Sequence, residues 1–145
     1  MSTILLPYDG SDPAKQAVEF AADSFPDAEV TLLHVVRRPA ETGYDLVGMP
    51  SKVGESTAEL LEAAHERGEE LLDEAATIAA DADLEVHREV VEGNPQRKIV
   101  EYAEENDVDH VVIGSHGRTG ASRVFLGSVA ERVARRSPTP VTIVR

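Results

Sequence analysis

One stretch decides the fold of this chain: residues 110–128, which read HVVIGSHGRTGASRVFLGS. It opens with the apolar run HVVI, typical of a buried strand, and closes on the glycine pattern Gly114-x2-Gly117-x9-Gly127-Ser128. Glycines let the backbone approach a ligand closely, and the free N–H groups at a helix N-terminus point at bound anions. The stretch therefore predicts a strand, a phosphate-binding loop and the start of a helix.

Positive charge is concentrated in the same part of the chain. Residues 114–145 carry six arginines and one acid, a formal charge of +5, although the whole chain has a charge of −13. Such a distribution focuses a positive field where an anion would bind. Arg132, Arg135 and Arg136 also fall where they complement the dipole of the expected helix. Arg118 is the candidate for a direct phosphate contact.

Length and composition indicate one soluble domain, residues 1–145, because 145 residues with 41% hydrophobic side chains can build a single core. The lack of cysteine excludes disulfides and thiolate metal sites, as expected in a reducing compartment. No segment has the pattern of a signal peptide or the length of an apolar membrane span. We therefore expect a cytoplasmic protein.

The acidity of the chain limits its partners. There are 27 acidic residues, and the chain's lysines are only Lys15, Lys52 and Lys98. Such a surface repels nucleic acids and acidic membranes, so neither is expected as a partner. High net charge also keeps a protein soluble in concentrated salt, which screens the repulsion. We expect a halophilic protein, the alternative being an ordinary acidic cytoplasmic one.

Strand-like and helix-like segments alternate along the chain. Apolar, β-branched runs predict strands, and apolar residues at helical spacing after a capping residue predict helices. The expected strands are 3–8, 30–36, 84–91, 109–113 and 140–144. The expected helices begin after Ser11-Asp12-Pro13 and Asn94-Pro95, or span 58–80 and 128–136. The segment 37–57 breaks the pattern and is expected to be a long loop that acts as a flap or contact surface.

This alternation predicts a three-layer α/β/α domain with an open, twisted, five-stranded parallel sheet. Apolar and polar residues alternate over 84–91, which favours an edge strand with one wet side. In such sheets, ligands bind beyond the carboxyl ends of the strands, where the strand order reverses. If the first and fourth strands flank that point, Asp9 and Gly114 meet there and can hold opposite ends of one nucleotide.

The chain resembles the ATP-binding branch of the universal stress protein family over essentially its whole length. The signature of that branch is the glycine pattern quoted above, which is present without departure. The resemblance implies a Rossmann-like, adenine nucleotide alpha hydrolase-like fold and a homodimer formed through the last strand. It also implies binding of ATP together with a divalent ion, Mg²⁺ or Mn²⁺. It implies no robust catalytic activity, and we assign no catalytic residue and no metal ligand.

The resemblance further implies which residues bind the nucleotide. Asp9, in Pro7-Tyr8-Asp9, stands where the family has an aspartate that contacts the adenine or the ribose, and Tyr8 places a bulky ring beside it. Val35 matches a valine that lines the adenine pocket. The ribose and phosphate contacts fall on Ile113, Gly114, Gly117, Gly127, Ser128 and Val129.

Other interpretations of these residues stay open. Asp9 could instead hold the turn that follows it, Ser128 is a good N-cap whether or not it binds phosphate, and His116 is best explained as a solvated loop residue. An adenylating or ATP-cleaving enzyme of related architecture and a nucleotide-free dimeric scaffold are the two alternative functions. No P-loop and no Gly-x-Gly-x2-Gly motif is present, so neither a P-loop NTPase nor a dinucleotide dehydrogenase is supported.

Overall fold

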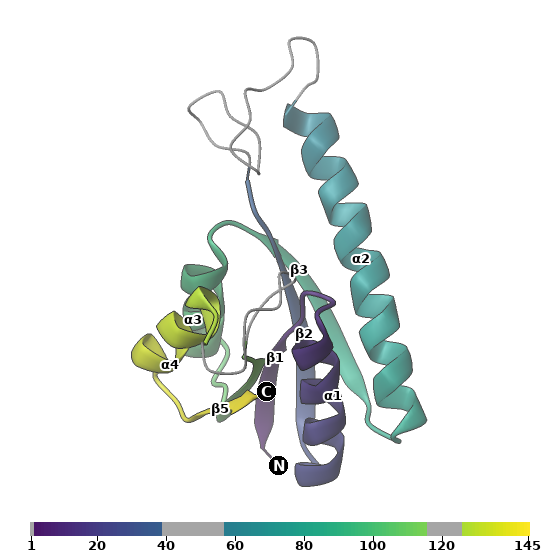
Figure 1. Cartoon of the computed structure of the whole chain (residues 1–145), viewed down its shortest axis with the longest axis vertical. Coiled ribbons are helices and arrows are strands. Elements are labelled where there is room, and N and C mark those ends of the chain that lie inside the picture. Colours follow the sequence, from purple (N-terminus) through teal and green to yellow (C-terminus); the bar gives the residue numbers. More distant parts are fainter. Residues whose placement is uncertain (1, 39–56, 116–125) are drawn as a thin grey trace.

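A computed structural model describes residues 2–38, 57–115 and 126–145 of the chain. In these ranges a five-stranded parallel sheet has the order β3-β2-β1-β4-β5, and helices cover both of its faces (Figure 1). The three-layer α/β/α prediction is therefore confirmed. The elements are β1 (Thr3–Pro7), α1 (Asp12–Ser24), β2 (Glu29–Val36), α2 (Thr57–Asp81), β3 (Val86–Glu92), α3 (Pro95–Glu105), β4 (His110–Gly114), α4 (Ser128–Arg136) and β5 (Val141–Val144).

Each helix start that the sequence predicted is present. The Ser11 hydroxyl caps α1 by accepting a hydrogen bond from the Ala14 N–H at 3.2 Å, and Asn94 caps α3 in the same way. A proline occupies the first turn of both helices, where a missing N–H costs nothing. The expected edge strand is also confirmed, since β3 lies at one end of the sheet, although it begins at Val86 rather than at residue 84.

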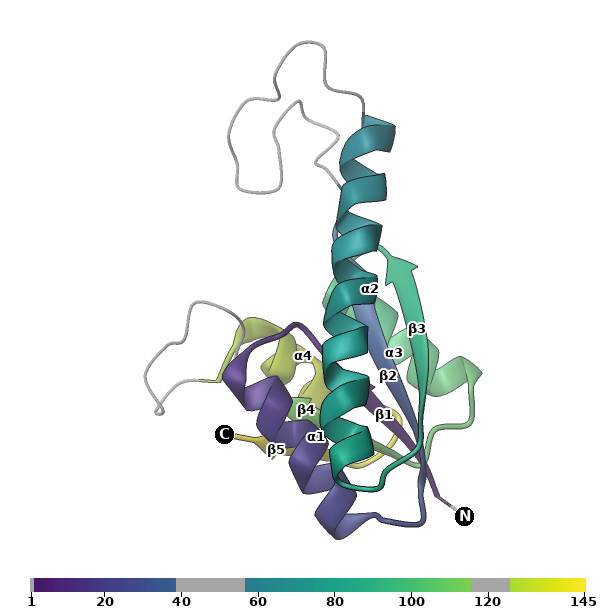
Figure 2. The same cartoon turned by 90° about the vertical axis from the view of Figure 1, so that its right-hand side faces the viewer.

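The core has two layers because the sheet is buried on both faces. Helices α1 and α2 pack on one face and α3 and α4 on the other, as Figure 2 shows from the side. Strand residues alternate between the layers: Ile4 and Leu6 of β1 face α1 and α2, while Leu5 faces the opposite layer. This double burial explains the continuous apolar runs of the sequence. No helix within the described ranges is long and apolar enough to cross a membrane.

Strand order reverses between β1 and β4. The chain runs outward from β1 through β2 to β3, then crosses to β4 on the other side of β1, where Leu5 pairs with Val111. The end of β4 lies against the first turn of α1. A Cβ at Gly114 would lie 2.7 Å from the Ala14 nitrogen and 2.8 Å from the Pro13 carbonyl carbon. Only glycine leaves room for this packing, which brings the carboxyl ends of both strands to one place.

Gly114→Ala should therefore destabilise the fold. The added methyl meets backbone atoms rather than a flexible side chain, so the helix must shift, at a cost of about 1–3 kcal/mol typical of overpacking. Thermal melting followed by circular dichroism measures the change, with a fall of several degrees expected. A variant that melts within one degree of wild type would show that α1 does not depend on this contact.

Candidate functional site

A cavity of about 630 Å³ opens at the carboxyl edge of the sheet, where the strand order reverses. Its wall brings together segments that are far apart in the sequence: the ends of β1, β2 and β4, and parts of all four helices. The described residues that line it are Pro7, Tyr8, Asp9, Ser11, Ala14, Leu33, His34, Val35, Val36, Arg37, Ala64, Arg67, Pro95, Ile99, Ile113, Gly114, Gly127, Ser128, Val129 and Ala130. Every described residue that the sequence analysis predicted to contact the nucleotide is among them. Gly117 and Arg118 lie outside the described residues.

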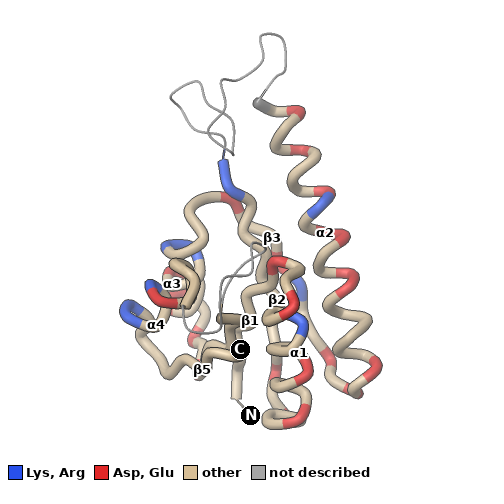
Figure 3. The backbone as a smooth tube through the Cα atoms, in the orientation of Figure 1, with Lys and Arg blue, Asp and Glu red and all other residues tan. Residues whose placement is uncertain are grey.

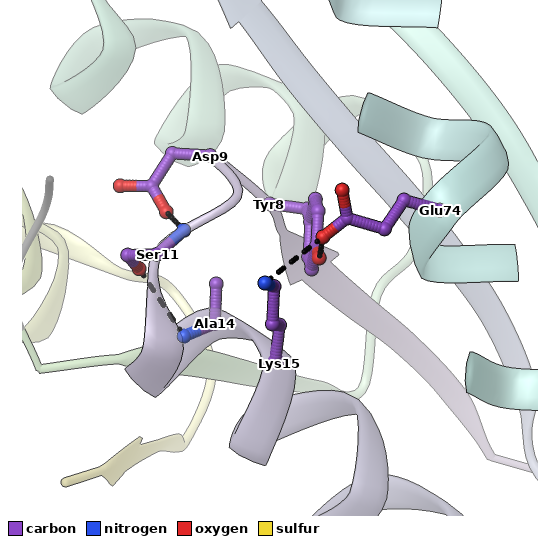
Figure 4. A network of polar contacts seen from close by, with 6 residues as sticks. All are labelled: Tyr8, Asp9, Ser11, Ala14, Lys15 and Glu74. Atoms are coloured by element: carbon purple, nitrogen blue, oxygen red, sulfur yellow. Dashed lines mark hydrogen bonds and ion pairs between the residues drawn. The ribbon is translucent and has the colours of Figure 1, made fainter. Parts of the chain in front are cut away.

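Asp9 follows β1 and lies in the middle of this edge. Its Oδ1 atom accepts a hydrogen bond from the Ser11 N–H at 2.9 Å, so the carboxylate holds the turn into α1. Its second oxygen points away from that turn (Figure 4). The structural role and the ligand role proposed from the sequence are therefore compatible, because one oxygen serves the turn and the other is directed elsewhere.

Tyr8 turns its ring away from Asp9 and toward α2. The ring is only 2% exposed, and its hydroxyl donates to Glu74 Oε1 at 2.9 Å, while Lys15 Nζ lies 3.3 Å from the same oxygen (Figure 4). Burial, reinforced by the bond to Glu74, raises the pKa of the Tyr8 phenol far above its ordinary value. The hydrogen bond from Tyr8 is the largest cause of the lowered pKa of Glu74. This network ties β1, α1 and α2 together beside the cavity.

His34 is a wall residue to which the sequence analysis gave no role. Its Nδ1 atom lies 2.9 Å from the Tyr8 carbonyl oxygen, and because a carbonyl only accepts, Nδ1 carries the proton. The ring lies against α2 at Gly68, where a Cβ would come within 2.6 Å of His34 Cδ2. Glycine inside a helix costs about 1 kcal/mol relative to alanine. Gly68, in the middle of an apolar helical stripe, was the one sequence feature that could have indicated a side chain packed closely against the helix at this point.

The opposite end of the cavity is the start of α4. The Gly127 N–H donates to the Ser115 carbonyl at 2.6 Å, which fixes the start of the helix next to the end of β4. The prediction that Ser128 caps α4 is wrong: Gly127 is the capping residue, and it makes no side-chain cap bond. Gly127 already has the extended backbone of a cap, so Ser128 is the first helical residue. Its hydroxyl is therefore not used as a cap.

Three backbone donors gather at this helix start. The first bond inside α4 runs from the Glu131 N–H to the Gly127 carbonyl at 3.0 Å, so the N–H groups of Ser128, Val129 and Ala130 have no acceptor within the helix. Such groups, with the positive end of the helix dipole, favour an anion. Across the described part of the chain, no group of three or more His, Asp or Glu side chains is arranged to hold a metal ion.

The chain is similar to known proteins over nearly its whole length. Residues 1–145 match the model of the universal stress protein family. Universal stress protein MJ0531 of Methanocaldococcus jannaschii is 38% identical over 98% of this chain and 81% of its own length. The solved structure of MJ0577 is 30% identical, with a TM-score of 0.80 over 99% of this chain and 94% of that one. A universal stress protein solved in complex with cAMP is 27% identical, with a TM-score of 0.71 over 99% and 97%.

Tyr8→Phe tests the polar network beside the cavity. Removing the hydroxyl deletes a hydrogen bond from a buried group, which should lower stability by about 1 kcal/mol at neutral pH. Because the folded pKa of Glu74 lies below its ordinary value, the stability that this carboxylate contributes is present above that ordinary value and is lost as pH falls through the lowered pKa. The stability difference between wild type and variant should therefore shrink below about pH 4.

Denaturant unfolding at pH 7 and at pH 3 measures this difference. Tyr102→Phe is the matched control, because the Tyr102 hydroxyl also donates to a carboxylate, Glu89, at 2.9 Å, but Tyr102 is only partly buried and does not line the cavity. It should cost less at pH 7. A Tyr8→Phe deficit that is the same at both pH values would contradict the assigned role of Glu74.

Proposed function

The chain belongs to the universal stress protein family, and we propose that it is a stress-response module that binds ATP in this cavity and senses the nucleotide rather than turning it over. The observation that carries the proposal is the joint placement, in one cavity at the reversal of strand order, of an aspartate and a helix start whose first N–H groups have no acceptor inside the helix. A ligand with a polar sugar in its middle and an anionic end matches that arrangement.

The base would lie on the apolar side of the cavity. Leu33, Ile99 and Ile113 are buried members of the core layer beneath α3 and α4, and Val35 packs against them. All four also line the cavity, so its wall is apolar here, as suits an adenine ring. Val35 keeps the role that the sequence resemblance implied for it.

The phosphates would lie at the start of α4. The Ser128 hydroxyl and the N–H groups of Ser128 and Val129 supply donors there, and Gly114 and Gly127 keep side chains out of the approach. Any Mg²⁺ or Mn²⁺ would arrive with the nucleotide and be held mainly by phosphate oxygens and water. Support for an adenine nucleotide as the ligand also comes from the 27% identical relative that was solved with cAMP.

The proposal extends to a homodimer formed through β5. This strand has a neighbour on one side only within the described residues, and its four residues are all partly exposed. Pairing two such edges about a two-fold axis would satisfy the open backbone groups of both. The expectations of a cytoplasmic, salt-adapted protein without nucleic-acid or membrane partners rest on the sequence alone, and they stay predictions.

Asp9→Asn tests the nucleotide site. Asparagine keeps an oxygen for the Ser11 N–H, so the turn should survive, while the loss of the charged acceptor should weaken ATP binding at least tenfold, about 1.4 kcal/mol. Calorimetric titration with ATP and Mg²⁺ measures the affinity. Asp12→Asn is the matched control, since it removes the same charge at an exposed position in the first turn of α1 and does not line the cavity.

The outcomes separate the competing functions. Wild type that binds neither ATP, ADP nor AMP would favour the nucleotide-free scaffold. Equal ATP affinity in wild type and Asp9→Asn would place the nucleotide elsewhere. Multiple turnovers of ATP at an enzymatic rate would favour the related ATP-cleaving enzyme.

Ile143→Pro tests the dimer. The Pro140 carbonyl accepts a hydrogen bond from Val111 of β4, and the Val144 carbonyl accepts one from Ser115, directly after β4. Alternate residues of β5 therefore direct their backbone groups toward β4, and the N–H of Ile143 points to the open edge. Proline at 143 should therefore block edge pairing and leave the monomer folded, whereas Thr142→Pro should break the ladder to β4 and unfold the domain. Light scattering gives the mass of each variant, and a wild type that is already monomeric would contradict the dimer.

A further inference from the structure

The α2 side of the cavity carries charge that the proposed function does not use. The lining residues from β2 and its end include His34, Val36 and Arg37, and those from α2 are Ala64 and Arg67. The start of α4 lies on the far side, because β1 and β4 separate it from β2 along the sheet edge. Two strand spacings amount to about 10 Å, so the cavity has two separate regions suited to anions.

The position of Arg67 in its helix is informative. Helix α2 contains eight acidic residues, and Arg67 is its only lysine or arginine. The charge pattern in Figure 3 shows how strongly acidic the helix is along its length. Arg67 pairs with Glu70 at 3.3 Å, but both side chains are more than half exposed. Such an exposed pair is worth little and does not occupy all five guanidinium donors, so Arg67 remains able to bind an anion.

Arg37 has its charge available. Among the residues that the structure describes, Arg37 makes no hydrogen bond or ion pair, whereas its neighbour Arg38 lies 3.4 Å from Glu92 Oε2. The other oxygen of Glu92 lies 2.5 Å from His65 Nε2. Arg38 and His65 therefore both pair with Glu92. Arg37, which lines the cavity, has no such partner among the described residues.

The balance of charge inside the cavity favours an anion on this side. Among the described lining residues, Asp9 is the only carboxylate, against Arg37 and Arg67, in a chain with a net charge of −13. Asp9 offsets at most one of these two positive charges, and its second oxygen points away from α2 (Figure 4). Arg37 and Arg67 line the same cavity, and a guanidinium group binds phosphate oxygens with paired hydrogen bonds.

We propose that Arg37 and Arg67 form a second phosphate subsite, so that a nucleotide with an additional phosphate on its ribose, separate from the 5′-phosphate, binds more tightly than the same nucleotide without it. The 5′-phosphate occupies the start of α4 and the second phosphate lies on the α2 side. This inference rests on the proposed nucleotide site and names the class of nucleotide that suits it best.

Titration with four adenine nucleotides tests the subsite. AMP provides the reference, adenosine 2′,5′-bisphosphate and 3′,5′-bisphosphate add a phosphate on the ribose, and ADP adds the same phosphate to the 5′ end instead. At one ionic strength, at least one bisphosphate should bind wild type ten times more tightly than AMP. Arg37→Gln, Arg67→Gln and the double variant should reduce that advantage, in the double variant to less than threefold, while the ratio of ADP to AMP affinity stays unchanged.

Arg88→Gln is the matched control, because Arg88 pairs with Asp73 outside the cavity and its loss changes the net charge equally. It should keep the tenfold advantage. The inference is overturned if neither bisphosphate binds wild type more tightly than AMP, if the double variant keeps the advantage, or if Arg88→Gln also loses it. Binding of AMP without a bisphosphate advantage overturns this inference alone; failure of every adenine nucleotide to bind overturns the proposed function and this inference with it.

Discussion

The contact between the first turn of α1 and Gly114 is the constraint on which the rest of the site depends. It brings the N-terminal end of α1 against the end of β4 at less than the distance that a side chain would need. The turn that carries Asp9 and the end of β4 therefore lie side by side, on either side of the reversal of strand order. The cavity lies here because α1 covers one face of the sheet and α4 covers the other, which leaves a crevice at the edge between them.

Helix α2 supports the other side of the cavity in two ways. The Tyr8 hydroxyl donates a hydrogen bond to the Glu74 carboxylate. Gly68 leaves room for the His34 ring, whose Nδ1 donates to the Tyr8 carbonyl. Both contacts act on the residue directly before Asp9. The helix thereby helps to position the aspartate through its neighbour, and the same helix contributes Arg67 to the wall. A long helix, buried along one face and acidic on its exposed surface, is in this way coupled to the binding site.

Much of this architecture was predictable from sequence because the signals are local. The capping residues Ser11 and Asn94, each followed by proline, mark helix starts without reference to the rest of the chain, and the doubly apolar strands mark a buried parallel sheet. The glycine pattern likewise placed Gly114 and Gly127 at the site. The roles of His34 and Arg67 were not predictable, because they depend on how α2 crosses the end of β2. That crossing is set by tertiary packing, for which Gly68 was the single local sign. The cap assigned to Ser128 was wrong by one residue, since the conformation of Gly127 decides where α4 begins.

The central claim is that an adenine nucleotide occupies this cavity with its 5′-phosphates at the start of α4. Crystals grown with ATP and Mg²⁺ test it most directly, through the difference density of the bound nucleotide. The account predicts phosphate oxygens within hydrogen-bonding distance of the Ser128 hydroxyl and the Val129 N–H, with the adenine ring against Val35. Density for ATP outside the cavity, or phosphates remote from α4, would contradict it.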